Sequence, residues 1–143
     1  SKNYDYIVIF EDDCEFKSDL HILDSYINEF INLQQSWDLF LLGYNPISVN
    51  PISNTNFSKI NRFDCTHACI LNTTFMTKLI NTYTEYVSNN TTLSIDTMYS
   101  NVIESYNLNA YGFRLNTSFF IQTSKYYHHR CRLRLHHQYY CFY

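Results

Sequence analysis

The chain has 143 residues, of which 45% are hydrophobic and 18% aromatic, and its formal net charge is −3. This length fits one domain with ample core material, which excludes an intrinsically disordered chain. The acidic balance argues against a nucleic-acid-binding protein, whose surface should be basic. No apolar run is long enough for a membrane span and no signal segment is visible, so we expect a soluble segment with its compartment left open.

Two elements are predicted in the first third of the chain. Tyr6–Phe10 is an uninterrupted β-branched and aromatic run, which predicts a strand buried on both faces, as in a parallel sheet. An amphipathic helix is predicted from Asp19 to about Leu33, with Ser18 as its cap. Its inward side chains are expected to be Leu20, Leu23, Ile27, Phe30 and Ile31.

The middle of the chain is predicted to contain two strands separated by a loop. Strands are expected at Asp38–Leu42 and Cys65–Leu71. Residues 44–59 are rich in Asn, Ser and Pro, which predicts a long loop and the least ordered internal segment. A helix capped by Asn72 should follow, with its inward side chains being Phe75, Leu79, Tyr83 and Val87.

A further helix is predicted from about Asp96 to Tyr106, with Met98, Val102 and Ile103 inward, before strands at 108–114 and 118–122. Strands alternating with helices predict an α/β layered domain over residues 1–125 with a largely parallel or mixed sheet. Residues 126–143 are biased to His, Arg, Tyr and Cys without a period, which is typical of a low-complexity basic tail.

The first predicted strand runs directly into three acids, Glu11, Asp12 and Asp13. The carboxyl edge of an α/β sheet is where such sheets bind ligands. Clustered carboxylates repel one another, and a hard divalent cation with oxygen ligands cancels that repulsion. The pattern therefore favours a Mn²⁺ or Mg²⁺ site at this strand end, against the simpler interpretation of a solvated acidic turn.

The acidic strand end belongs to an ordered set of short motifs. In chain order they are Tyr4-Asp5-Tyr6 with Ile-Val-Ile-Phe-Glu-Asp-Asp, Trp37-Asp38-Leu39 with Leu42-Gly43, Thr66-His67-Ala68 before Asn72, and Ile95-Asp96. This succession resembles the second half of the catalytic domain of glycosyltransferase family 25, which includes lipopolysaccharide galactosyltransferases and the procollagen galactosyltransferases. The resemblance extends to about Gln122.

The resemblance implies a GT-A-like fold and inverting transfer of a hexose, commonly galactose, from a UDP-sugar to a hydroxyl of a glycan or of a hydroxylysine-type protein acceptor. It implies that Glu11, Asp12 and Asp13 hold Mn²⁺ or Mg²⁺, with Asp12 also beside the substrate. It further implies that Asp96 is the catalytic base and that His67 binds substrate. The family's N-terminal half, with much of the uridine pocket, is not in this sequence, so we expect an incomplete fold and weak UDP-sugar binding by these residues alone.

Several of these residues also have simpler interpretations. Asp96 at a helix start is explained by the helix dipole alone. Cys65, His67 and Cys69 would share one face of a regular strand, which allows a zinc site but lacks paired Cys-X-X-Cys spacing. His128 or His129 in the tail is a candidate late metal ligand. The aromatic residues expected in the core rather than at a sugar are Trp37, Tyr44, Tyr83 and Tyr86.

Two other functions remain open from the sequence. The chain is alternatively a truncated, catalytically inactive transferase remnant that acts at most as a binding module. It is alternatively a different metal enzyme, such as a phosphotransferase or nuclease. With only 2 glycines, no phosphate-binding glycine loop is available for that second alternative.

Overall fold

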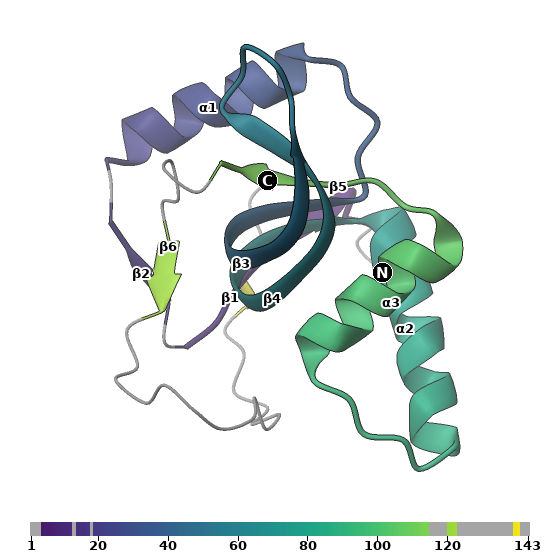
Figure 1. Cartoon of the computed structure of the whole chain (residues 1–143). Coiled ribbons are helices and arrows are strands. Elements are labelled where there is room, and N and C mark those ends of the chain that lie inside the picture. The colour runs from purple at the N-terminus through teal and green to yellow at the C-terminus, as the bar shows by residue number, and fades with distance from the viewer. Residues whose placement is uncertain (1–3, 13, 18, 115–119, 123–138, 141–143) are drawn as a thin grey trace.

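Three helices and a curled sheet form the part of the chain that the structure describes (Figure 1). The computed structural model describes residues 4–12, 14–17, 19–114, 120–122 and 139–140. The strands are β1 (Tyr6–Phe10), β2 (Cys14–Phe16), β3 (Leu39–Pro51), β4 (Phe57–Asn72), β5 (Ala110–Phe113), β6 (Phe120–Gln122) and β7 (Tyr139–Tyr140). The helices are α1 (Leu20–Asn32), α2 (Thr73–Ser88) and α3 (Ile95–Tyr106).

The main sheet is mixed, and β4 is its longest strand. β4 pairs antiparallel with β1, with β3 and, through its first residues, with β5. β5 also runs parallel to the start of β3, from Leu39 opposite Ala110. Because β5 contacts both β3 and β4, the sheet curls on itself (Figure 1). This confirms the predicted α/β class with a mixed sheet.

The helices cover the two faces of the sheet and make two hydrophobic clusters. α1 packs Phe30 against Phe40 and Phe57, with ring centroids 4.5 and 5.3 Å away. On the other face, α2 and α3 pack Phe75 and Tyr99 against the sheet. The chain therefore builds a sheet between two helical layers, and β1 contributes side chains to both.

The strand Tyr6–Phe10 is confirmed, but its expected environment is wrong. β1 is antiparallel to β4, with Ile9 opposite Cys69, and it also pairs with β7. Its residues after Tyr6 are half-buried rather than fully buried. The run of apolar residues in β1 is uninterrupted because both faces of this strand are apolar. Each face borders one of two cavities, which are described below.

The long loop predicted for residues 44–59 is wrong. These residues belong to the β3–β4 hairpin, in which Asn45 faces Asp64 and Pro51 faces Ser58. The structure places Pro46 beside a register shift and Pro51 at the strand end, positions at which a missing N–H is tolerated. Tyr44 is buried, and its hydroxyl donates to the carbonyl of Phe113 at 2.8 Å.

The predicted helices are confirmed, although parts of their predicted inward faces are wrong. The N-cap of α1 is Asp19, whose carboxylate accepts from the amide of His21, while Ser18 lies outside the described residues. Four residues expected to point inward are instead exposed, namely Leu20, Ile31, Tyr83 and Val87. In α1 and α2, fewer apolar side chains pack against the sheet than the helical spacing of apolar residues predicts. The inward face of α3 is confirmed, because Met98, Val102 and Ile103 are buried.

The predicted strand at 108–114 is confirmed by β5, whereas only the end of the predicted strand at 118–122 is described, as β6. β6 pairs with β2, a strand that the sequence did not predict. Of the tail at 126–143, only β7 is described, so His128 and His129 lie outside the described residues.

Candidate functional site

The site begins where β1 ends. The amide of Glu11 donates to the carbonyl of His67 at 3.0 Å, which extends the β1–β4 ladder by one bond. The amide of Cys14 then donates to the carbonyl of Glu11 at 3.1 Å and closes a turn. Glu11 is half-buried at this strand end and Asp12 is exposed on the turn. Asp13 lies outside the described residues.

A cavity of about 300 Å³ lies beside Glu11, between the β1–β4 pair and helices α2 and α3. Its walls are mainly aliphatic and include Ile7 and Ile9 of β1 and Leu79 of α2. Its polar lining residues are Glu11, Thr66, His67 and Tyr99, together with the thiol-bearing Cys69. The cavity therefore has one polar region within apolar walls, which is the usual composition of a small-molecule site.

A β-bulge shapes the polar region. Cys65 has a φ of 49°, in the left-handed region that residues with a side chain rarely adopt. Its amide donates to Asp64 Oδ1 at 3.1 Å. The register with β3 shifts nearby, between Gly43 and Asn45. Such bulges re-aim side chains and occur often beside active sites. The alternation predicted for Cys65, His67 and Cys69 therefore fails at Cys65.

Beyond the bulge, β4 reaches the start of α3. The amide of Thr66 donates to Asp96 Oδ1 at 2.9 Å. Asp96 lies in the first turn of α3, two residues after the N-cap Ser94, and is 2% exposed. One carboxylate oxygen thus fixes β4 to α3 while the charge lies at the favourable end of the helix dipole.

The predicted substrate residues lie in different surroundings. His67 is 5% exposed and lines the cavity, and its carbonyl receives the Glu11 amide. Asp12 does not line the cavity. The structure therefore brings Glu11 and His67 to one cavity with Asp96 behind it, and leaves Asp12 outside on the turn.

The electrostatics of the cavity connect the two acids. Burial raises the pKa of the Cys69 thiol, and the charges of Glu11 and Asp96 raise it further, against a hydrogen bond from Tyr99. Burial also raises the pKa of the Tyr99 hydroxyl well above its ordinary value, and the contact with Cys69, followed by the charges of Asp96 and Glu11, adds to the effect. Both groups stay neutral at ordinary pH, and both acids act on the same buried pair.

Sequence reasoning did not single out Thr66 or Tyr99 as members of this site, and it considered Cys69 only in the alternative of a zinc site with Cys65 and His67. Tyr99 follows Asp96 by three residues, and i, i+3 positions share a helix face, so its placement beside Asp96 was predictable from spacing. Thr66 was noted only as part of a motif. The hydrogen bond from its amide to Asp96 joins residues thirty positions apart. Patterns of neighbouring residues in the sequence do not predict such a contact.

The donor set at the strand end consists of hard carboxylate oxygens, which suit Mn²⁺ or Mg²⁺. Within the described residues, no group of three or more His, Cys, Asp or Glu side chains is arranged to hold a metal ion. Glu11 and Asp12 would supply two carboxylates. The third predicted ligand, Asp13, lies outside the residues that the structure describes.

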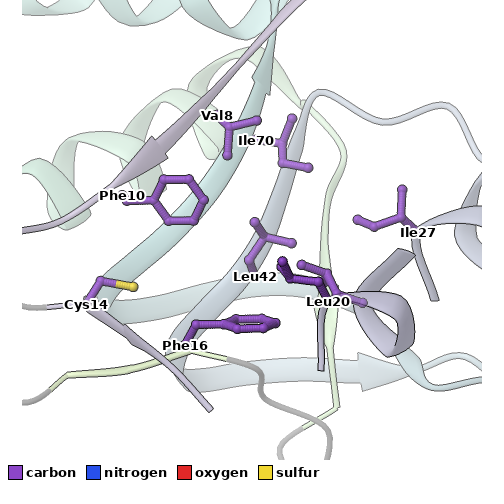
Figure 2. A pocket seen from close by; sticks show the side chains of 9 residues that line it. Val8, Phe10, Cys14, Phe16, Leu20, Ile27, Leu42 and Ile70 are labelled. Atoms are coloured by element: carbon purple, nitrogen blue, oxygen red, sulfur yellow. The ribbon is translucent and has the colours of Figure 1, made fainter. Parts of the chain in front are cut away.

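A second cavity, of about 450 Å³, lies on the opposite face of β1 (Figure 2). Val8 and Phe10 of β1 point into it, opposite Phe16 of β2 and Ile27 of α1 (Figure 2). Its lining is apolar apart from the thiol of Cys14, which offers no acid or base for catalysis. The polar cavity beside Glu11 is therefore the candidate site.

A scan of protein-family models finds no match to this sequence, and a search of curated proteins finds no significant match either. Among the described residues, no helix combines the length and apolar character that crossing a membrane requires.

Proposed function

We propose that this chain is the metal-binding and acceptor-side part of an inverting glycosyltransferase that transfers a hexose from a UDP-sugar to a hydroxyl acceptor. The observation that carries the proposal is that Glu11 and His67 line one cavity at the end of β1, and that Asp96 is bonded to the amide of Thr66, another residue of that lining. The ordered motifs that resemble family 25 support the same assignment.

The roles follow from where these residues lie. Glu11 and Asp12 lie at the strand end and, with Asp13, would hold Mn²⁺ or Mg²⁺. That cation would supply the positive charge that stabilises a departing diphosphate. Asp12 is exposed on the turn, and in this proposal it would lie beside the bound nucleotide.

On the acceptor side, Asp96 would remove the proton of the attacking hydroxyl. Its Oδ1 is held by the Thr66 amide, which leaves Oδ2 as the oxygen that takes the proton. The acceptor would bind in the cavity lined by His67 and Tyr99, beside Thr66, whose amide is bonded to the 2% exposed Asp96. His67 would orient the acceptor, and the aliphatic walls would exclude water.

A second function is favoured by the burial of Asp96. Asp96 is nearly inaccessible, accepts a hydrogen bond from a backbone amide and lies in the first turn of a helix. These structural roles explain its presence without any catalytic role. This favours an inactive transferase remnant that binds ligands without turning them over. The two functions differ in turnover, not in cation binding.

Mn²⁺ binding followed by electron paramagnetic resonance tests the proposal on this chain. We expect saturable binding that Glu11→Gln weakens at least ~10-fold, because a charged oxygen ligand becomes neutral. Glu104→Gln removes an exposed acid on α3 and serves as the matched control. Unchanged binding in Glu11→Gln would contradict the assignment of the cation to this strand end. Cation binding by this chain, combined with no UDP release from UDP-galactose by a parent enzyme that also contains a nucleotide-binding half, would favour the remnant.

A further inference from the structure

Strand β4 is longer than its partner β3 where the two strands pass the candidate site. In the register between them, Gly43 faces Ala68 and Asn45 faces Asp64. A single residue of β3 therefore lies between these two pairs, whereas β4 places residues 65–67 there. The excess length of β4 leaves the ladder as a bulge, and this bulge contains two residues of the cavity lining, Thr66 and His67.

The bulge begins at a residue with an unfavourable backbone conformation. Cys65 has a φ of 49°, and in this left-handed region the Cβ of an ordinary residue crowds the following carbonyl oxygen. Among the described residues, the others with a positive φ lie in turns or directly after helices, and they are Gln34, Asn54, Asn90 and Asn107. Cys65 instead lies inside a strand. Strain of this kind persists only where the surrounding structure imposes it, and it occurs often at functional sites.

The left-handed conformation determines where the next residue points. Directly after Cys65, the amide of Thr66 donates to Asp96 Oδ1 at 2.9 Å, between strand β4 and helix α3. Thr66 and His67 are successive and both buried, and both line the same cavity. The side chains of a regular strand alternate between its two faces, so a regular strand does not give this arrangement.

We infer that Cys65 is a positioning residue, whose left-handed backbone, and not its thiol, directs the Thr66 amide to Asp96 and so fixes the proposed base. The inference rests on the proposed function only for the role of Asp96 as the base. The geometry that it claims can be measured on this chain without turnover. It requires that position 65 favour residues that tolerate a positive φ, of which glycine is the most tolerant.

The first test compares glycine with alanine at two positions of β4. Arg62 is exposed, faces Ser48 and does not have a positive φ, so it serves as the matched control. In a regular strand glycine is the less stable of the two residues, so Arg62→Gly should melt below Arg62→Ala. At the left-handed position the order should reverse, and Cys65→Gly should melt above Cys65→Ala. The same order at both positions would overturn the inference.

The second test asks whether the conformation of residue 65 holds the bond to Asp96. Hydrogen exchange of the Thr66 amide is measured by NMR relative to the amides of β5, which separates local loss of the bond from global unfolding. We expect the Thr66 amide to exchange at least ~10-fold faster in Cys65→Val, because a β-branched residue disfavours the left-handed region, and within ~3-fold of wild type in Cys65→Gly.

The proton shift of the same amide gives a signature that stability alone does not produce. A bond to a carboxylate is short and charge-assisted, so its loss should move the Thr66 amide proton upfield in Cys65→Val and not in Cys65→Gly. Unchanged exchange and shift in Cys65→Val, or equal changes in the two variants, would overturn the inference. Either result leaves the transferase proposal standing, because that proposal is tested with Mn²⁺ and UDP-galactose.

Discussion

The backbone amide of Thr66 donates to Oδ1 of Asp96 at 2.9 Å, inside the protein, and so joins the bulged strand β4 to the first turn of α3. This bond gives Asp96 a structural role that any catalytic role must accommodate. It also places Asp96 behind the cavity that Glu11 and His67 line.

Substitutions of Asp96 separate the two roles. Asp96→Asn retains an oxygen that can accept from the Thr66 amide, so we expect it to cost less than ~1 kcal/mol of unfolding free energy while removing the carboxylate that we propose as the base. Asp96→Ala leaves a buried amide without an acceptor and should cost about 1–3 kcal/mol. Urea denaturation measures both. Equal losses in the two variants would mean that the hydrogen bond does not determine the stability of this contact.

The stability of the fold should decrease at alkaline pH. Burial raises the pKa of Tyr99 above its ordinary 10.0 and that of Cys69 above its ordinary 9.0. The folded state therefore holds these protons when the unfolded state releases them, so the stabilisation is complete below pH 9 and is lost as the pH rises past 9 and 10. Thermal unfolding between pH 7 and pH 11 should show a decreasing melting temperature. Tyr99→Phe should flatten the decrease above pH 10, and a slope identical to wild type would contradict this assignment.

Asn72 joins three segments at the opposite end of the sheet. Its Oδ1 caps α2 by accepting from the Phe75 amide at 2.9 Å, and its Nδ2 donates to the carbonyl of Trp37 at 2.7 Å and to Asp38 Oδ1 at 3.3 Å. Asn72→Asp keeps the cap but places a carboxylate beside Asp38. We expect a loss of about 1–3 kcal/mol in this variant at neutral pH, despite an intact cap. An unfolding free energy equal to wild type would show that the cap alone matters.

Gly112 is required by the close approach of β5 to β3. A Cβ at this position would lie 2.8 Å from Cε1 of Tyr44 and 3.0 Å from the carbonyl oxygen of Leu41. The Tyr44 ring is fixed by its bond to the Phe113 carbonyl, so we expect Gly112→Ala to cost about 1–3 kcal/mol. In a Tyr44→Leu background the cost should be smaller, because the tighter contact is gone. A cost that is equal in both backgrounds would assign the strain to the backbone contact instead.

Local patterns in the sequence predicted the helices and the first strand, and non-local contacts account for most of what they missed. Asn72 was correctly predicted as a cap because its side-chain oxygen accepts from the amide of Phe75, only three residues further on. The hairpin at residues 44–59 was missed because its Asn, Ser and Pro residues pair with β4 rather than showing a period of their own. Within the candidate site, Glu11 and His67 were predicted from motifs. The bulge at Cys65 and the bond from Thr66 to Asp96 depend on how β4 meets α3, which no local pattern contains.

The central claim is that the acids after β1 hold the cation of a glycosyl transfer. The most direct test is Mn²⁺-dependent UDP release from UDP-galactose by a parent enzyme that contains these residues together with a nucleotide-binding half, compared with its Asp13→Asn variant. We expect turnover to decrease about a hundredfold or more, because a charged ligand of the cation is lost. The unfolding free energy should stay within ~0.5 kcal/mol, since removing one of three adjacent carboxylates relieves repulsion. Near-normal turnover by Asp13→Asn would contradict the account.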